Sequence, residues 1–513
     1  MTHQQKKSST NSHPSDPLHK HNIHHFRIAE PSPYHTTSNQ PTMSSDYPLT
    51  NAVRALLDKR PEITDVEFAL EFLPQAGVDP QGVGQASNDR LVKTARMMLS
   101  LFSKEETNSS DEDSNTPPWT DEDREASLQR LVEDFSILPQ VGAVPRVPFG
   151  KTGLKMPIIT IGCMRFQMAW GDRVQNMNQV EADCQDNLLA ILRTAILKYG
   201  MVHIETARAY GSSELQIGAA LKQMLLAKEV QRKDLIIQTK VNPSADPEEF
   251  RSELEKSMRL LGVDYLDLFS VHGFNMPEHF EWCFGQDGNN CMKVVREFRD
   301  AGKIRHVGFS THGPTDLILK AIDTDEFEYV NLHYHAFGSY TASGYGKTRT
   351  GGNYEVLERL QEKEMGCFII SPYDKGGGLY APSHKLRRLV APKAEPIVFH
   401  SWWLWHHSEL FAQYDKPGPP IHTFTVGAAR VSDLDEPALA AHYFKTKLQD
   451  SLAKTMRVWE RLVMVREQSL GEDWAKNWFQ GLPKALTSQY QIEHNQMVWL
   501  YNSVKAFGLY EFA

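Results

Sequence analysis

The sequence predicts an α/β fold, a (β/α)8 TIM barrel with additional helical segments at both termini. From residue 145 to residue 440, short apolar runs rich in β-branched residues alternate with segments whose apolar residues recur at helical spacing. Eight such units follow one another, and alternation of this kind is typical of a parallel sheet covered by helices. An open doubly wound sheet is the alternative, because periodicity alone does not show that the sheet closes.

The expected strands are short and apolar on both faces. The first reads PIITIG, a run that suits a strand buried on both sides. In chain order, the eight expected strands are Pro157–Gly162, Val202–Thr206, Asp234–Lys240, Leu266–His272, Lys303–Ser310, Glu328–Tyr334, Cys367–Ser371 and His422–Gly427.

Amphipathic segments fill the intervals between these strands. In the first interval, apolar residues from Leu188 to Tyr199 recur at i, i+3, i+4, i+7, i+8 and i+11, the stripe of a helix that packs on a sheet. After the third strand, Asp246 can cap a helix, Pro247 suits its first position and Gly262 can end it. The remaining helices are expected at 215–226, around 294–298, at 314–322, at 354–363 and within 396–410.

The chain has 513 residues, which exceeds the usual size of one core, so the barrel is expected to carry appendages. Residues 1–45 are rich in Ser, His, Pro and Thr and are expected to be disordered. Residues 46–138 carry helical patterns, interrupted by an acidic linker at 105–121, and predict an N-terminal extension. Residues 441–513 predict a helical C-terminal extension.

The composition excludes several classes of partner. The net charge is -9 with acidic and basic residues mixed along the chain, which argues against a nucleic-acid surface. The sequence contains no run of about 18 apolar residues, so it predicts no membrane-spanning helix. The five cysteines form no C-x-x-C pair, which is typical of reduced thiols and argues against an iron-sulfur cluster or structural zinc. We therefore expect a cytoplasmic protein with small-molecule partners, and the oligomeric state stays open.

Four polar side chains fall where a barrel places its functional groups, at the carboxyl ends of the strands. Glu205, Lys240 and His272 end the second, third and fourth expected strands, and Tyr210 lies in the loop after the second. Each residue alone has an ordinary structural explanation. Their joint placement on three neighbouring strand ends predicts that these four residues, called the tetrad below, share one pocket.

The tetrad has a chemical logic. A tyrosine with a pKa of about 10 is a poor acid near neutral pH, but a neighbouring ammonium lowers that pKa. Lys240 would supply this field to Tyr210, and Glu205 would compensate the buried charge of Lys240. His272 would donate a hydrogen bond to a carbonyl oxygen beside Tyr210.

Three segments carry a resemblance to a known family: Glu205-Thr-Ala-Arg-Ala-Tyr-Gly211, Leu261-Gly-Val-Asp-Tyr-Leu-Asp-Leu-Phe-Ser-Val-His272 and Gly302-Lys-Ile-Arg-His-Val-Gly-Phe-Ser310. The chain resembles the aldo/keto reductases, in particular the branch with the motif HIETARxYG. The resemblance implies an NAD(P)H-dependent oxidoreductase that reduces an aldehyde or ketone to an alcohol, or catalyses the reverse, by hydride transfer. The tetrad would be catalytic, with Tyr210 as general acid and base.

The resemblance also implies cofactor-binding positions after most of the strands. Backbone amides in the segment after the eighth strand can hold phosphate, and Arg430 could form a bidentate bond to a 2′-phosphate, which favours NADP (NADPH) over NAD. The implied cofactor-binding residues are Cys163, Met164, Ser310, Thr311, Asn331, Ser371, Gly427, Arg430 and Asp433.

The chain departs from the family pattern at several positions. Glu205 replaces the usual Asp and is longer by one methylene, which changes the geometry rather than the charge of the site. Thr311, Ile370 and Pro437 stand where the family commonly has Asn, Tyr and Asn. No cysteine follows Cys367, so the iron-sulfur tail of the related branch is not expected.

Two other functions compete with carbonyl reduction. A nicotinamide-nucleotide-binding sensor or assembly subunit with little turnover would explain the departures and the helical extensions. A metal-dependent hydrolase could use His333 and His335, which have the spacing of two ligands on one strand face, but no third ligand is in register and no metal is expected. The glycine-rich segment Gly344–Thr348 predicts an ordinary loop. Substrate choice would depend on the loops at 273–290 and 336–352.

Overall fold

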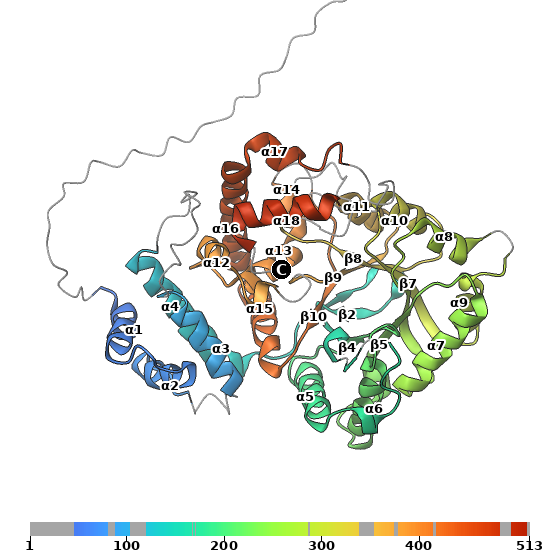
Figure 1. Cartoon of the computed structure of the whole chain (residues 1–513), viewed down its shortest axis with the longest axis horizontal. Coiled ribbons are helices and arrows are strands. Elements are labelled where there is room, and N and C mark those ends of the chain that lie inside the picture. Colours follow the sequence, from blue (N-terminus) through green and yellow to red (C-terminus); the bar gives the residue numbers. More distant parts are fainter. Residues whose placement is uncertain are drawn as a thin grey trace, which may run out of the picture. The chain divides into compact units, whose positions relative to one another are not determined.

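The expected strands form a closed barrel of eight parallel strands (Figure 1). The computed structural model describes residues 46–80, 88–102, 119–166, 168–169, 171–285, 288–337, 353–373, 378–413, 417–482 and 494–509. The strand order around the barrel is β10-β3-β4-β5-β6-β7-β8-β9, so the closed barrel is confirmed and the open sheet is wrong. The strands are β3 (Ile159–Gly162), β4 (His203–Glu205), β5 (Ile236–Val241), β6 (Leu266–Val271), β7 (Ile304–Thr311), β8 (Tyr329–His333), β9 (Gly366–Ile370) and β10 (Thr423–Gly427).

The register of the barrel brings the strand ends to one rim. The last strand pairs with the first, with Gly427 opposite Gly162, and Gly162 in turn lies opposite Glu205. Lys240 lies opposite Ser270, two residues before His272. Because all strands are parallel, their carboxyl ends meet at the same rim, which is where the tetrad was expected.

Helices surround the sheet between successive strands (Figure 1). The expected caps of α7 are confirmed: the Asp246 side chain accepts from the Glu248 amide, and Gly262 ends the helix with a φ of 65°. The region predicted at 396–410 is two helices that meet at His406. The helices from β3 to the end of the barrel are α5 (Ala182–Arg193), α6 (Ser213–Leu226), α7 (Pro247–Leu261), α8 (Pro277–Phe284), α9 (Cys291–Asp300), α10 (Thr315–Ile322), α11 (Tyr354–Glu362), α12 (His384–Val390), α13 (Pro396–Trp405), α14 (His407–Ala412) and α15 (Asp435–Thr446).

A short hairpin precedes the barrel and was not predicted. Strands β1 (Arg146–Pro148) and β2 (Lys155–Pro157) pair antiparallel. Between them lies Phe149, which is fully buried and whose ring centroid is 5.6 Å from that of Tyr329. Gly366 packs so closely on this ring that an added Cβ would lie 2.6 Å from it. Tyr329 and Gly366 begin their strands, so Phe149 seals the amino-terminal end of the barrel.

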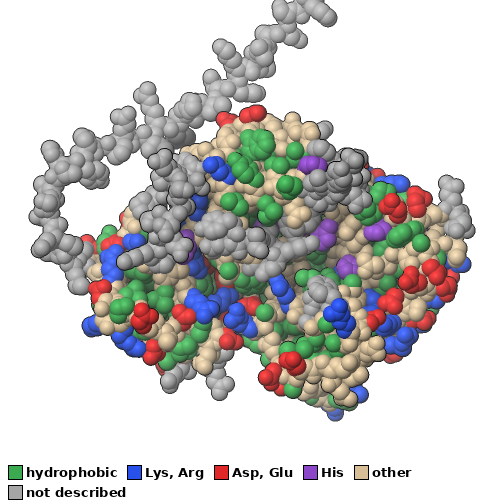
Figure 2. Space-filling view, viewed as in Figure 1, with side chains coloured by type: hydrophobic (Ala, Val, Ile, Leu, Met, Phe, Trp, Pro, Cys, Tyr) green, Lys and Arg blue, Asp and Glu red, His purple; other side chains and the backbone are tan. Residues whose placement is uncertain are grey.

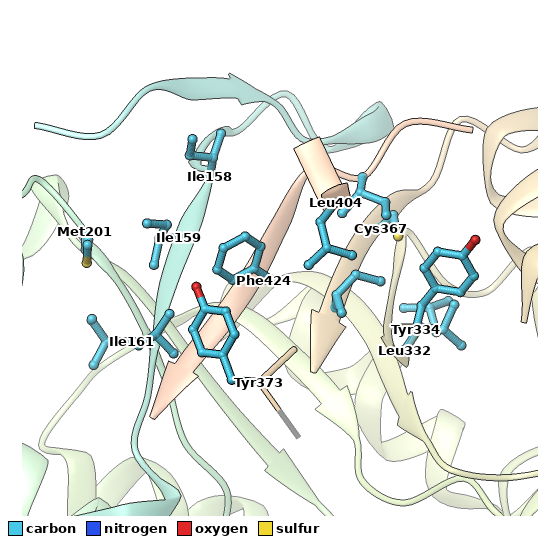
Figure 3. Packing of buried hydrophobic residues seen from close by; sticks show 14 of the residues in the cluster. Ile158, Ile159, Ile161, Met201, Leu332, Tyr334, Cys367, Tyr373, Leu404 and Phe424 are labelled. Atoms are coloured by element: carbon cyan, nitrogen blue, oxygen red, sulfur yellow. The ribbon is translucent and has the colours of Figure 1, made fainter. Parts of the chain in front are cut away.

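The apolar core continues outward from the strands to the helices. Figure 3 shows Ile159 and Ile161 of β3 and Phe424 of β10 among the buried side chains of this cluster. Tyr373, which follows β9, packs edge-on against Phe424 with ring centroids 5.8 Å apart. The strands are therefore buried on both faces, as their continuous apolar runs predicted.

The N-terminal extension has a core of its own. Helices α1 (Pro48–Lys59), α2 (Asp65–Gln75), α3 (Asn88–Leu99) and α4 (Asp121–Ile137) bury a separate apolar cluster that includes Phe68, Phe72 and Leu131. Asp121, which was expected to end the acidic linker, instead begins α4, because the Thr120 side chain caps the helix by accepting from the Asp123 amide. The rest of that linker up to 118, and the expected disorder of residues 1–45, lie outside the described residues.

The C-terminal extension is helical, as expected. Its described residues form α16 (Leu448–Leu470), α17 (Glu472–Asn477) and α18 (His494–Phe507). Its predicted boundary at residue 440 falls inside α15, so the helix of the barrel continues to Thr446.

The surface agrees with the mixed charge pattern of the sequence. On the face drawn in Figure 2, acidic and basic side chains are interspersed. Within the described ranges, no helix has the length and the apolar character needed to cross a membrane.

We predict that Phe149→Ala destabilises the barrel by about 3–5 kcal/mol, because the substitution opens a cavity at a fully closed end of the core. Urea unfolding followed by tryptophan fluorescence measures this change. Leu226→Ala serves as the control, since Leu226 is 74% exposed and its removal opens no cavity. Equal midpoints for both variants would contradict a sealing role for Phe149.

Candidate active site

A cavity of about 580 Å³ opens at the carboxyl ends of the barrel strands. All four residues of the tetrad line it, so the sequence-based prediction that they share one pocket agrees with the structure. The lining comprises Gly162, Met164, Arg165, Glu205, Tyr210, Lys240, His272, Gly273, Ser310, His312, Ile370, Ser371, Pro372, Tyr373, Tyr380, Thr425, Gly427, Ala429, Arg430 and Asp433.

Lys240 and Glu205 form a buried ion pair at the floor of this cavity. The Lys240 ammonium contacts the Glu205 carboxylate directly, and its Nζ also donates to the Thr206 carbonyl at 2.9 Å. Both side chains are almost fully buried. Burial lowers the pKa of Lys240, while the adjacent carboxylate opposes this shift by stabilising the charged form. The longer side chain of Glu205 thus still reaches Lys240.

Tyr210 is held by the backbone of its own loop. The Arg208 amide donates to the Lys240 carbonyl at 2.8 Å, and the Tyr210 amide donates to the Ala207 carbonyl at 3.0 Å. Gly211 follows with a φ of 54°, a conformation that favours glycine. This geometry leaves the Tyr210 ring centroid 4.7 Å from the Lys240 Nζ.

The net pKa shift of Tyr210 is opposite to the expected one. Burial raises the pKa of the Tyr210 phenol above its ordinary value, and this desolvation dominates over the field of the nearby ammonium. The phenol is therefore protonated at neutral pH. In this state it can donate a proton, but it is a poor proton acceptor.

His272 completes the group. It directly follows β6, and its amide donates to the Val241 carbonyl at 2.8 Å. Its ring lies nearly perpendicular to that of Tyr210, with centroids 5.6 Å apart. Burial lowers the pKa of His272 well below 6.5, and the charge of Lys240 adds to this shift. The imidazole is consequently neutral and can act as a hydrogen-bond donor.

Six of the nine expected cofactor-binding residues line the same cavity: Met164, Ser310, Ser371, Gly427, Arg430 and Asp433. Cys163, Thr311 and Asn331 do not. The Cys163 amide donates to the Glu205 carbonyl at 2.9 Å, and the Thr311 hydroxyl donates to the Phe274 carbonyl at 2.8 Å. These two residues hold loops beside the cavity.

Asn331 belongs to a buried polar layer beneath the tetrad. Its Oδ1 accepts from the Gln238 amide at 3.2 Å and from the Ser270 hydroxyl at 3.1 Å. Gln238 in turn contacts His203 Nε2 at 2.9 Å, and burial lowers the pKa of His203 to about 3. The Asn331 side chain satisfies polar groups inside the barrel and is not part of the cavity wall.

The segment after β10 is organised by Asp433. Its carboxylate accepts from the amides of Ala429 at 2.9 Å and Arg430 at 3.2 Å. Two of the amides that were expected to hold phosphate therefore bind Asp433. The Arg430 side chain is 53% exposed, with its Nε 3.6 Å from Asp433, so its guanidinium is accessible.

Several lining residues were missed from the sequence. Arg165 and Tyr373 lie within two residues of predicted positions, and their closeness to Met164 and Ser371 could have indicated them. Tyr380 comes from a short 3-10 helix (Gly378–Tyr380) for which the periodicity holds no signal.

The structure gives little support to a metal site. His333 and His335 are buried, with parallel rings 6.2 Å apart. In the part of the chain that the structure describes, no group of three or more His, Cys, Asp or Glu could hold a metal ion. The glycine-rich segment Gly344–Thr348 lies outside the described residues.

Several known proteins are similar to this chain in sequence. Residues 159–377 match the model of the aldo/keto reductase family. The chain is 28% identical over 172 residues to an uncharacterized oxidoreductase of Schizosaccharomyces pombe, covering 31% of this chain and 52% of that protein. It is 31% identical over 138 residues to an aldo-keto reductase of Mycolicibacterium smegmatis, covering 27% and 46%. The chain thus spans about half the length of the curated relatives it matches.

Two solved structures are also similar. An aldo-keto reductase from Bacillus halodurans in its holo form is 16% identical, with a TM-score of 0.44, covering 61% of this chain and 96% of that one. An aldo-keto reductase from Klebsiella pneumoniae in complex with NADPH is 19% identical, with a TM-score of 0.42, covering 62% and 95%.

The fold defines the class: a closed (β/α)8 barrel whose polar side chains meet at the carboxyl ends of its strands. Within that class, residues 159–377 are similar to the aldo/keto reductase family, as the resemblance of its motifs predicted.

A further buried carboxyl lies against β5 and was missed from the sequence. Glu214, in the first turn of α6, is fully buried, and the hydroxyl of Thr239 donates to its Oε1 at 2.5 Å. Burial raises the pKa of Glu214 to about 7. The folded state therefore holds this proton more tightly than the unfolded state, whose pKa is near 4.5. The contribution of Glu214 to stability is largest below pH 4.5 and declines as the pH rises through 7.

We predict that Glu214→Gln removes this decline. Relative to wild type, the variant should gain on the order of 3 kcal/mol of unfolding free energy between about pH 4.5 and about pH 8. Urea unfolding at several pH values within this range measures the difference. Glu255→Gln, at an exposed position of α7, should retain the wild-type pH dependence. An unchanged slope in Glu214→Gln would contradict the assignment of a raised pKa.

Proposed function

We propose that the chain is an NADP-dependent oxidoreductase of the aldo/keto reductase type, which reduces an aldehyde or ketone to an alcohol or catalyses the reverse. One observation carries this proposal. The centroid of the Tyr210 ring lies 4.7 Å from the Lys240 Nζ, and this ring is perpendicular to the neutral ring of His272, in one cavity. A proton donor and a hydrogen-bond donor at one point are what reduction of a carbonyl oxygen requires.

The cavity has the chemistry to hold a nicotinamide dinucleotide. Arg165 and Arg430 supply two cations for its phosphates. At the tetrad end, Ser310 accepts from the Gly273 amide at 3.1 Å, which leaves its own hydroxyl proton available. Gly162 allows the Thr425 side chain to pack closely against the cavity wall, because an added Cβ there would clash with the Thr425 hydroxyl. When bound, the cofactor would supply the hydride.

The residues of this chain would handle the proton. The Tyr210 phenol donates its proton to the carbonyl oxygen, and the neutral imidazole of His272 donates a hydrogen bond to the same oxygen. The charge of Lys240, balanced by Glu205, stabilises the phenolate that remains. Because burial raises the pKa of Tyr210, the phenol keeps its proton at neutral pH, which is the form that starts a reduction.

A second candidate is a nicotinamide-nucleotide-binding sensor or assembly subunit with little turnover. It is favoured by Thr311, whose hydroxyl bonds to the Phe274 carbonyl and does not line the cavity. It is also favoured by Ile370, which lines the cavity with an aliphatic side chain. Under either candidate we place the protein in the cytoplasm, which its five free thiols support.

We predict that Tyr210→Phe lowers carbonyl-dependent oxidation of NADPH by about 10²–10⁴-fold, because the substitution removes only the proton donor. The Kd for NADPH should stay within about threefold of wild type, measured by cofactor fluorescence. Tyr501→Phe, at an exposed position of α18, is the matched control and should keep full turnover.

Two results would redirect this assignment. Unchanged turnover in Tyr210→Phe would show that another group donates the proton. Tight NADPH binding by the wild-type protein, without turnover on a broad panel of aldehydes and ketones, would select the sensor.

We predict that Arg430→Met raises the Kd for NADPH by about 10–100-fold and changes the Kd for NADH by less than about threefold, because only NADPH carries the 2′-phosphate. Parallel fluorescence titrations with both cofactors measure the two constants. Arg457→Met, at an exposed position of α16, controls for the loss of a surface charge. Equal losses for the two cofactors would argue against a 2′-phosphate contact.

A further inference from the structure

The N-terminal extension is joined to the segment that follows β10. We call residues Gly427–Glu436 the ribose segment; it contains Arg430, Asp433 and a short 3-10 helix (Val431–Leu434). Arg90 of α3 donates from Nε and Nη2 to the two carboxylate oxygens of Asp435, at 2.8 and 2.7 Å. Both side chains are nearly buried, with 12% and 5% of their surface exposed. This is a bidentate ion pair withdrawn from solvent.

Lys93, one turn further along α3, makes three contacts in the same place. Its Nζ lies 2.6 Å from the Glu436 carboxylate and donates to the Ser432 carbonyl at 3.3 Å. It also lies 5.2 Å from the ring centroid of Tyr380. Tyr380 lines the cavity, and its hydroxyl donates to the Asp433 carbonyl at 3.1 Å. A continuous series of contacts therefore runs from α3 to the cavity wall.

These ion pairs are more important for the stability of the segment than surface ion pairs are, because they are largely buried. Exposed pairs contribute about 0–1 kcal/mol, whereas removing one partner of a buried pair leaves an uncompensated charge. Without Arg90, Asp435 would retain the Tyr199 hydroxyl, 3.1 Å from its Oδ1, as a partner. A single neutral donor does not balance a buried carboxylate, so the first turn of α15 would shift towards solvent.

Resting on the proposed function, we propose that Arg90 and Lys93 are positioning residues for the dinucleotide site. They hold the ribose segment in the conformation in which Arg430 and Asp433 line the cavity. The N-terminal extension thereby sets the affinity for the cofactor and the preference for NADPH over NADH. Neither residue lines the cavity itself.

Another arginine of the same helix offers a matched control. Arg96 also lies on α3, but its guanidinium faces α2 and pairs with Asp65 at 2.7 Å, with 66% of the Arg96 side chain exposed. Arg96→Gln removes the same charge from the same helix without touching the ribose segment. Its cofactor affinity and turnover should equal those of wild type.

The test compares Arg90→Gln, Lys93→Gln and Arg96→Gln in the full chain. We expect Arg90→Gln and Lys93→Gln to raise the Kd for NADPH by about 5–50-fold and the Kd for NADH by less than about threefold. The kcat at saturating NADPH should stay within about twofold of wild type, because the tetrad is untouched. Arg90→Lys should recover part of the affinity, since it restores charge without the bidentate contact. Cofactor fluorescence and steady-state kinetics give these values.

The outcomes separate this inference from the proposed function. The inference is overturned if both glutamine variants bind NADPH within about twofold of wild type. It is also overturned if NADH affinity and kcat fall together with NADPH affinity, as general destabilisation would cause. Lys93 is more exposed than Arg90, so its substitution disturbs the fold less. If Arg90→Gln does not fold, the NADPH affinity of Lys93→Gln tests the inference. A wild-type protein that binds NADPH without turnover refutes the reductase alone, and one that binds neither cofactor refutes both.

Discussion

The site depends on how the protein accommodates the charge of Lys240 inside the barrel. Transferring an ammonium from water to the interior has a penalty of several kcal/mol, which good geometry and further hydrogen bonds must offset. Glu205 and the Thr206 carbonyl provide this compensation from the neighbouring strand. The two strands are brought side by side by the closed barrel, so the ion pair follows from the fold. It places the Lys240 Nζ 4.7 Å from the centroid of the Tyr210 ring.

Much of the fold could be predicted because buried parallel strands leave a local signal. Runs such as Ile159–Gly162 are continuous in apolar, β-branched residues, and chain order then brings Glu205, Lys240 and His272 to neighbouring strand ends. The hairpin around Phe149 was missed because strands of three residues are too short to show a period. Their pairing depends on the barrel end that they cover.

The properties of the site that were not predicted from the sequence have one cause in common. Each depends on contacts between residues that are distant in the sequence. The direction of the pKa shift of Tyr210 depends on burial by the assembled rim, which local residue types do not reveal. Asn331 is at a strand position like those of the site, yet its partners Gln238 and Ser270 draw it into the barrel interior. The helical pattern of α3 could be predicted, but not the partner of Arg90, because 345 residues separate it from Asp435.

The pairing of β3 with β10 affects the order in which the parts of the chain fold during synthesis. The first barrel strand, β3, ends at Gly162 and pairs with β10, which ends at Gly427. The sheet therefore cannot close until Gly427 has emerged from the ribosome. The N-terminal extension has its own apolar cluster, complete once residue 135 has emerged. Domains fold as units during synthesis, with the N-terminal one first. The extension can thus be structured while the barrel is still an open sheet with two unpaired edges.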